Sequence, residues 1–469
     1  MSLWPSPWPA EDGGPRRSQA PSEVQGLGIR PDERLVTAAV RDAFATTMVV
    51  LREPGEVFAL RHTLGRRPLR DPSTGWVERI DPITLAAVGR SPDLAAGPFW
   101  PGGIAAHANG SLHVVYGCFC HRLSAQLKLL ASRRLPQPRP YNSFVVLADG
   151  TLAMKDIDRA RRHPARLTLL DPETLAPRCP DLHLPESVVA RLSADGDSLY
   201  AIGERTVYRY RWDGDRLQCD LEIPYLASRG QSYGWDPVIE GGQLWFLDNG
   251  EHDYATTMLG AGVAPGPVHL IRISLADPSD REQVQVCGAP RGAVTDPPLY
   301  DPQRRIAIGY DSANGVLAAF RFTDRLEPLW RRPLAHAAHM IRYPDTGELV
   351  VHDWTGPALA RTRAVRTISA RAGWLARSRR LRAVAARSSG DDVVVLDIET
   401  GAERGRALVP SMFQSVLFPA PGWGRDLYWC TFSTLARLEV RWARQAGTLE
   451  RSRWAGSSAQ TVSHYVCAG

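Results

Sequence analysis

The chain has 469 residues, 44% of them hydrophobic, so it can bury a large core in one repetitive domain or in two to three ordinary ones. Its formal net charge of +6 is localised, because nine arginines lie between Arg361 and Arg387 and the rest is near neutral. A basic surface for nucleic acids is therefore not expected. There is no run of eighteen apolar residues, no apolar signal-peptide core and no framework spacing of the seven cysteines. These features predict a cytoplasmic protein with reduced thiols and no membrane partner.

Residues 1–41 are rich in proline, serine, glycine and charged residues. This composition predicts a flexible N-terminal arm outside the folded domain. Residues 456–469 are expected to form a C-terminal tail.

Between residues 42 and 455 the chain repeats a unit of four short β runs, and successive units begin roughly forty to seventy-five residues apart. Turn dipeptides separate the first and second runs, as in Asn109-Gly110, Asp149-Gly150 and Asp195-Gly196. No alternation of strands and helices occurs. The pattern predicts an all-β fold, a single β-propeller of four-stranded antiparallel blades. The units favour eight blades; seven would follow if the first and last units shared one blade.

The stretch from Gly234 to Asp253 shows the unit most clearly, with two β runs joined at Gly241 and Gly242. Asp236 precedes the first run and Asp248 follows the second. A hairpin returns the chain to the face it left, so we expect these two acids to lie close together.

A family resemblance is carried by the turns between third and fourth strands. These turns are IDPITL at Ile80 to Leu85, LDPETL at Leu170 to Leu175 and LDIETG at Leu396 to Gly401. They resemble the turn signature of the YVTN and quinoprotein-like β-propellers. The resemblance implies a fold and no particular activity.

One segment, Thr355 to Gly390, interrupts the seventh unit between its second and third strands. It is rich in arginine and alanine. We expect either a solvated insertion or a lid over the face discussed next.

In a propeller, the connection into the first strand and the connection out of the second strand open on one face, near the axis. Polar residues occupy these positions in several units. The set comprises Asn142, Lys155, Asp236, Asp248, Asp296, Asp311, His339, His352 and Gln414. We expect the side chains of Asp236, Asp248, Asp296, His339 and His352 to surround one axial pocket, with the other four completing the ring.

Crowded carboxylates require a cation, shared protons or a salt partner. The candidate metal ligands are Asp236, Asp248, Asp296 and Asp311. Oxygen ligands suit Ca²⁺ or Mg²⁺, whereas the two histidines favour a transition metal. Without a metal, neighbouring carboxylates would have divergent pKa values, which allows one acid and one base. The candidate catalytic residues are Asp236, Asp296, His339, His352 and Lys155.

Aromatic residues share these positions and predict a funnel for an apolar or aromatic small molecule. The candidate substrate-binding residues are Asn142, Trp235, Tyr310, Trp354, Phe413 and Gln414. Such a site predicts a hydrolase, or a lyase or isomerase that catalyses a cyclisation. The alternative is a non-catalytic scaffold that binds a protein partner or a ligand on this face.

A divalent metal is the expected cofactor. The sequence contains no phosphate-cradling glycine loop, so no nucleotide is expected. It also contains no nucleophile elbow and no HExxH motif. Eight blades would also suit a quinone-dependent dehydrogenase. Because repeated tryptophan docking motifs and a signal peptide are lacking, PQQ is not expected.

Overall fold

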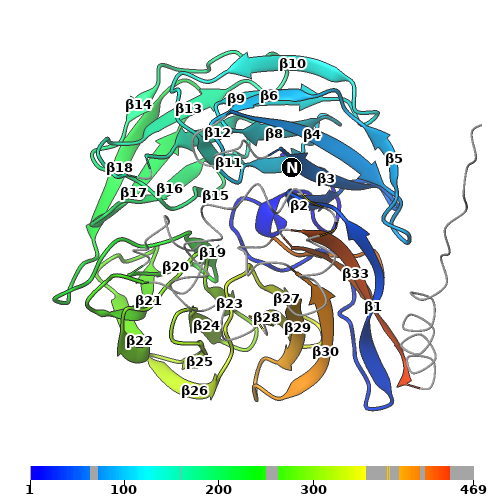
Figure 1. The fold of residues 1–469 in the computed structure, drawn as a ribbon. Coiled ribbons are helices and arrows are strands. Elements are labelled where there is room, and N and C mark those ends of the chain that lie inside the picture. Colours follow the sequence, from blue (N-terminus) through cyan, green and yellow to red (C-terminus); the bar gives the residue numbers. More distant parts are fainter. Residues whose placement is uncertain are drawn as a thin grey trace, which may run out of the picture.

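The computed structural model describes residues 2–63, 72–158, 160–249, 262–354, 378, 380, 390–411, 418–431 and 433–443. In these residues, eight antiparallel sheets follow one another around a ring (Figure 1). The fold is an eight-bladed β-propeller. The prediction of eight blades is confirmed, and the seven-bladed alternative is wrong.

The first four blades are built from consecutive strands. Blade 1 contains β2 (Thr46–Leu51), β3 (Val57–His62), β4 (Ser73–Ile80), β5 (Ala87–Arg90) and β6 (Leu94–Gly97), which pairs with β4. Blade 2 contains β7 (Gly103–Ala106), β8 (Leu112–Tyr116), β9 (Phe119–Leu123) and β10 (Leu129–Arg134). Blade 3 contains β11 (Tyr141–Val146), β12 (Leu152–Asp156), β13 (Arg166–Leu170) and β14 (Leu182–His183). Blade 4 contains β15 (Ser193–Asp195), β16 (Ser198–Ile202), β17 (Thr206–Trp212) and β18 (Leu217–Pro224).

The next three blades repeat this order, and the last blade combines both ends of the chain. Blade 5 contains β19 (Val238–Glu240), β20 (Gln243–Leu247), β21 (Pro267–Ser274) and β22 (Arg281–Pro290). Blade 6 contains β23 (Leu299–Asp301), β24 (Ile306–Asp311), β25 (Val316–Phe322) and β26 (Leu326–Arg332). Blade 7 contains β27 (Ile341–Tyr343), β28 (Glu348–Trp354), β29 (Gly390–Asp397) and β30 (Glu403–Pro410). Blade 8 contains β31 (Ala420–Pro421), β32 (Asp426–Cys430), β33 (Thr434–Trp442) and, outermost, β1 (Glu33–Asp42).

Local turn chemistry fixes the register of the inner hairpins. Gly241 and Gly242 join β19 to β20 with φ of 60° and 72°, values that a residue without Cβ adopts without strain. Glu240 consequently faces Gln243 across the turn. The hairpin predicted for this stretch is confirmed.

The turns that carry the family resemblance share one hydrogen-bonding scheme. Oδ1 of Asp81 accepts the backbone N–H of Thr84 at 2.7 Å and its hydroxyl at 2.8 Å. Asp171 binds Thr174 in the same way. The following residue has positive φ in each turn, which explains why the third copy carries Gly401 there.

The N-terminal segment differs from the prediction of a flexible arm outside the propeller. Figure 1 shows the dark-blue chain in the middle of the ring, and Trp8 and Leu27 in it are buried. Its carbonyls accept N–H groups of the inner strands, including Leu51, Ala106, Ala194, Ile239 and Arg342. It then continues into β1, which pairs antiparallel with β33 and closes the ring. The arm is structured because the ring supplies both hydrogen bonds and apolar contacts that its composition alone does not reveal.

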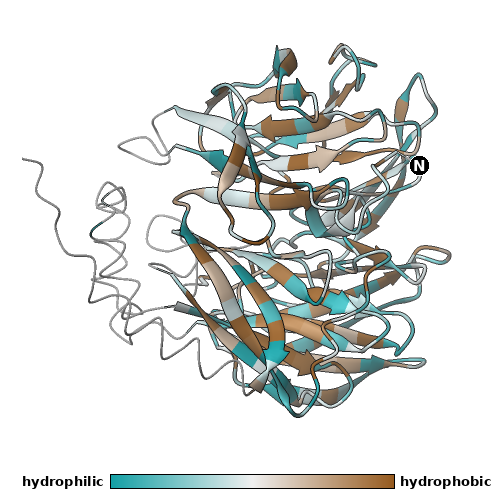
Figure 2. Ribbon diagram, turned by 90° about the vertical axis from the view of Figure 1, so that its right-hand side faces the viewer, coloured by the Kyte–Doolittle hydropathy of each residue, from teal (hydrophilic) through white to brown (hydrophobic). Residues whose placement is uncertain are grey.

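The hydrophobic core lies within and between the blades. Figure 2 shows hydrophobic residues along the strands, whereas many connections are hydrophilic. Many first and second strands of the blades are almost wholly buried. Every residue of β2, β11 and β24 is buried. The predicted insertion falls between β28 and β29, but apart from residues 378, 380 and 390 it lies outside the described residues, as does the tail 456–469.

Candidate axial site

Three of the five residues predicted to surround the axis do meet there. Asp236, Asp296 and His339 each precede the inner strand of their blade, in the adjacent blades 5, 6 and 7. Nε2 of His339 lies 3.0 Å from Oδ1 of Asp296. One ligand atom of His339 and one of Asp236 lie within 4.8 Å of each other.

The Tyr310 hydroxyl positions Asp296. It donates a hydrogen bond to the backbone carbonyl of Asp296 at 2.8 Å and accepts its N–H at 2.6 Å. Tyr310 is fully buried, so this aromatic residue, predicted to bind substrate, instead fixes the backbone that carries an axial acid.

Three further charged residues come from the N-terminal segment. Its short 3-10 helix η1 (Glu11–Gly13) carries Glu11 and Asp12, and Arg17 follows. Nη1 of Arg17 contacts both acids, at 2.8 Å from Oδ2 of Asp12. Oδ1 of Asp12 lies 2.7 Å from Nδ1 of His339. The segment therefore reaches His339, which the sequence predicted to face a substrate.

Arg191 completes the group from blade 4. Its backbone N–H donates to Oδ1 of Asp236 at 2.6 Å, and its Nη1 lies 2.8 Å from Oε2 of Glu11. We call Glu11, Asp12, Arg17, Arg191, Asp236, Asp296 and His339 the axial cluster. Each of its members is at most 6% exposed.

Burial and ion pairing compete within the axial cluster. Burial raises the pKa of Asp236, although the nearby Arg17 and Arg191 oppose the shift. Burial also disfavours the His339 cation, but Asp12 and Asp296 on either side of the ring outweigh it and raise its pKa to about 10. Without a metal, His339 is consequently an imidazolium ion between two carboxylates.

Lys155 and Asn142 lie beside this group and bind each other. Nζ of Lys155 donates to Oδ1 of Asn142 at 3.0 Å and to the carbonyl of Val188 at 2.8 Å. Burial lowers the pKa of the Lys155 amine to about 7. A buried amine of this kind can act as a base, but the side chain is only 1% exposed.

Asp248 and Asp311 lie outside the axial cluster, contrary to expectation. Oδ1 of Asp248 accepts the backbone N–H of His269 at 2.6 Å, and Oδ2 of Asp248 lies 2.9 Å from Nδ1 of His269. Asp311 accepts the N–H groups of Ala293 and Asn314, both at 3.1 Å. Both acids stand at the end of a second strand, where they satisfy backbone donors that the ladder leaves unpaired. Their position therefore has a structural cause.

His352 also differs from expectation. Its Nδ1 lies 3.4 Å from Nδ1 of His336, and its Nε2 lies 3.6 Å from Oδ1 of Asp391. All three residues are fully buried. Burial lowers the pKa of His336 to about 3 and raises that of Asp391 well above its usual value, which favours the neutral forms. The Tyr310 ring packs edge-on against the His336 ring, with the ring centroids 4.9 Å apart.

Two more of the predicted substrate-binding residues are too buried to line an open funnel. Trp235 and Trp354 are buried, at 6% and 4% exposure. Phe413 and Gln414 lie outside the described residues. The sequence interpretation missed Glu11, Asp12, Arg17 and Arg191. Arg191 precedes β15 by two residues, as Asp236 precedes β19, so the same positional rule would have identified it.

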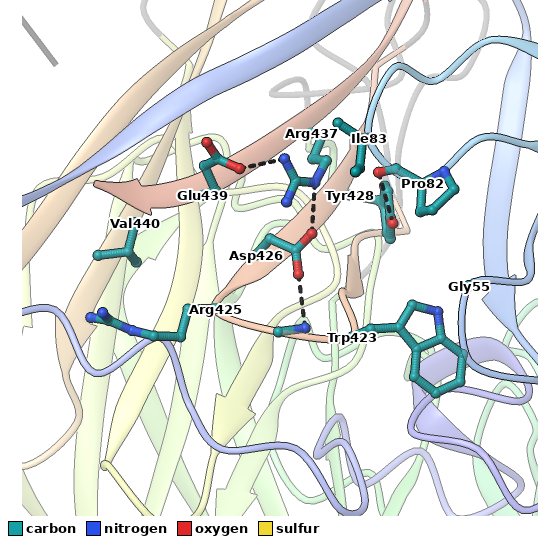
Figure 3. A pocket seen from close by; sticks show the side chains of 11 residues that line it. Gly55, Pro82, Ile83, Trp423, Arg425, Asp426, Tyr428, Arg437, Glu439 and Val440 are labelled. Carbon is teal, nitrogen blue, oxygen red and sulfur yellow. Dashed lines mark hydrogen bonds and ion pairs between the residues drawn. The ribbon is translucent and has the colours of Figure 1, made fainter. Parts of the chain in front are cut away.

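A pocket of about 390 Å³ lies where the ring closes, between blades 8 and 1 (Figure 3). We call it the seam pocket; its lining comprises Gly55, Pro82, Ile83, Trp423, Gly424, Arg425, Asp426, Tyr428, Arg437, Glu439 and Val440. Arg437 Nε lies 2.7 Å from Asp426, and the Tyr428 hydroxyl donates to the carbonyl of Pro82 at 3.1 Å. Ile83 is 64% exposed at its edge. The pocket thus combines aromatic, aliphatic and paired charged groups.

Among the described residues, no helix is long and apolar enough to span a membrane. No family model and no curated protein matches the sequence.

Solved structures match at the level of the fold. BamB from Moraxella catarrhalis superposes with a TM-score of 0.53 at 11% identity, over 86% of this chain and 99% of that one. The quinohemoprotein alcohol dehydrogenase from Comamonas testosteroni gives 0.55 at 9% identity, over 92% and 80%. The related enzyme ADHIIG from Pseudomonas putida HK5 gives 0.53 at 9%, over 93% and 80%. This chain is therefore similar to quinoprotein-like propellers in architecture, and the likeness carries no activity.

Proposed function

We propose that the protein is a non-catalytic propeller that binds a protein partner, and that the partner docks at the seam pocket. The observation that supports this most is the position of the N-terminal segment. It occupies the axis, where Asp12 contacts His339 and Glu11 pairs with Arg191, the blade 4 residue whose backbone N–H binds Asp236. Groups that are buried and paired within their own chain are poorly placed to meet a substrate.

The composition of the seam pocket supports a protein partner. Trp, Tyr and Arg are the residue types enriched in the energetic centres of protein interfaces. Trp423, Arg425 and Arg437 supply two of these types, and Tyr428, which also lines the pocket, is fully buried. The two arginines face Asp426, Glu439 and Glu33, so the pocket has little net charge. This suits an apolar or aromatic side chain flanked by polar groups, rather than a strongly charged ligand.

The test uses two exposed aliphatic residues of blade 1. Ile83 lies in the seam pocket at 64% exposure, and Val88 lies on β5 at 62% exposure, outside its lining. A photo-crosslinking amino acid is placed at either position in the full chain, in cells that produce it naturally. We expect one protein to crosslink from position 83 and not from position 88.

The purified partner should then bind the wild-type chain, and binding should weaken at least tenfold in Ile83→Glu but not in Val88→Glu. Equal crosslinking or equal binding from both positions would contradict docking at the seam pocket.

A second candidate is acid–base catalysis at the axis, on a small apolar or aromatic metabolite. The observation that favours it is Lys155, whose amine has a pKa lowered to about 7 by burial beside Asn142. Substrate would reach it only after the N-terminal segment moved away. Turnover of a metabolite that is lost in Lys155→Met and increased by removal of residues 1–30 would support this candidate over the first.

A further inference from the structure

Three donor groups on the axis converge as metal ligands do, and a fourth lies beside one of them. One ligand atom each from Glu11, Asp236 and His339 lies within 4.8 Å of the others. A fourth donor, Oδ1 of Asp296, lies 3.0 Å from Nε2 of His339. All four residues are buried, at 0–5% exposure. The spacing of the first three matches donor atoms arranged around a common central point.

His339 and Asp296 face each other at ion-pair distance, with Nε2 of His339 3.0 Å from Oδ1 of Asp296. Nε2 of His339 and Oδ1 of Asp296 are both buried atoms without a hydrogen-bond partner among the described residues. A buried donor or acceptor left without a partner is costly. An ion between the two atoms would satisfy both of them.

The other ring nitrogen of His339 is arranged as in known metal sites. Metal-bound histidines generally donate their second N–H to a carboxylate or carbonyl, which fixes the tautomer and the ring orientation. Nδ1 of His339 lies 2.7 Å from Asp12, so this carboxylate leaves Nε2 as the coordinating atom. Arg17 holds Asp12 in turn, at 2.8 Å.

The charge of the axial cluster also fits a divalent cation. Its four carboxylates are those of Glu11, Asp12, Asp236 and Asp296, and its permanent cations are Arg17 and Arg191. With His339 neutral, as coordination requires, two negative charges remain. A divalent ion neutralises them.

We propose that the axis holds one divalent transition-metal ion, coordinated by Glu11, Asp236, Asp296 and Nε2 of His339. An imidazole with carboxylates suits Zn²⁺ or Mn²⁺ better than Ca²⁺, and Zn²⁺ should bind more tightly than Mn²⁺. Because the ligands come from η1 and from blades 5, 6 and 7, the ion attaches the N-terminal segment to the ring. This role is independent of the partner proposed for the seam pocket.

The experiment compares refolding with and without zinc. The full chain is unfolded in urea with EDTA, freed of both, and refolded with or without one equivalent of Zn²⁺. We expect about one zinc per chain by elemental analysis and a melting temperature higher than that of the metal-free protein. Refolded protein that retains no zinc and melts at the same temperature would overturn the proposal.

Two aspartates of blade 5 provide matched variants. Asp236→Asn should retain less than a tenth of the zinc, whereas Asp248→Asn, an equally buried acid paired with His269, should retain it all. X-ray absorption of the wild-type zinc protein keeps the test independent of variant folding. We expect nitrogen and oxygen ligands with one imidazole; sulfur ligands from the cysteines, or equal zinc in both variants, would contradict this site.

Discussion

Asp12 and His339 lie 327 positions apart in the chain, yet the Asp12 carboxylate is 2.7 Å from Nδ1 of His339. This contact joins the N-terminal segment to the start of the inner strand of blade 7. It also places an acid of the segment where the sequence predicts a substrate. The axis of this propeller is consequently closed by the chain itself.

Removal of the Asp12 carboxylate should destabilise the protein strongly. Asp12→Ala leaves Arg17 and His339 buried with one partner fewer, a change that typically costs about 3–5 kcal/mol. Urea unfolding at pH 7 measures the free energy. The control is Asp93→Ala, whose ion pair with Arg90 is exposed and should contribute less than about 1 kcal/mol. Equal small losses in the two variants would contradict an integrated axial cluster.

The N-terminal segment should also contribute through its apolar contacts. Trp8 is 2% exposed, so Trp8→Ala should lower the free energy of unfolding by about 3–5 kcal/mol. Trp423→Ala, in the partly exposed lining of the seam pocket, should cost far less. Thermal and urea unfolding of both variants test this. A stable Trp8→Ala protein would mean that the segment is dispensable.

Acid should weaken the fold through its buried neutral histidines. Burial lowers the pKa of His113 to about 3, and its ring lies 2.8 Å from the carbonyl of Pro172. The unfolded chain protonates this group near pH 6.5, so below that pH the unfolded state binds more protons. Stability should therefore fall as the pH drops from about 6.5 towards 3.

His113→Gln should flatten this part of the profile, measured by urea unfolding at half-unit pH steps. His163→Gln, at an exposed position, is the control and should reproduce the wild-type slope. An unchanged slope in His113→Gln would contradict the assignment of a neutral buried ring.

The aspartates that define the family-like turns should each contribute modestly. Asp171→Ala removes the acceptor of the Thr174 N–H at 2.8 Å and of its hydroxyl at 2.9 Å. We expect a loss of about 1 kcal/mol, as for comparable capping contacts. The double variant with Asp81→Ala should show the sum of the two losses, because the turns belong to different blades. A loss in the double variant that differs from this sum would indicate coupling between the two turns, which these contacts do not provide.

The sequence predicted the blades well because their signals are local. Paired glycines at Gly241 and Gly242 and the Asp81-to-Thr84 turn depend on nearby residues only. The closure of the ring was not predictable in this way. The contact between Glu33 and Arg425 spans 392 positions, and proline-rich composition gives no indication that a segment will thread a channel.

The sequence predicted an axial residue correctly only where its position in the blade determines that it reaches the axis. Asp236, Asp296 and His339 meet because each stands just before an inner strand. Asp248 and Asp311 carry the same residue type at strand ends, where an acid that caps backbone N–H groups cannot be distinguished from a ligand by sequence. Arg17 and Glu11 could not be found without knowing that the N-terminal segment enters the ring.

Hydrogen exchange of the N-terminal segment tests the central claim most directly. The amides of Gly13, Gly14, Arg17 and Gln19 are hydrogen-bonded within the segment, and the axial cluster around them is buried. Mass spectrometry of the intact, full-length chain should therefore show peptides from residues 9–20 exchanging at least about a thousandfold more slowly than an unstructured chain, comparably with β19 and β27. Exchange of residues 9–20 at the rate of an unstructured peptide, with the blades still protected, would contradict an axis closed by the protein's own N-terminus.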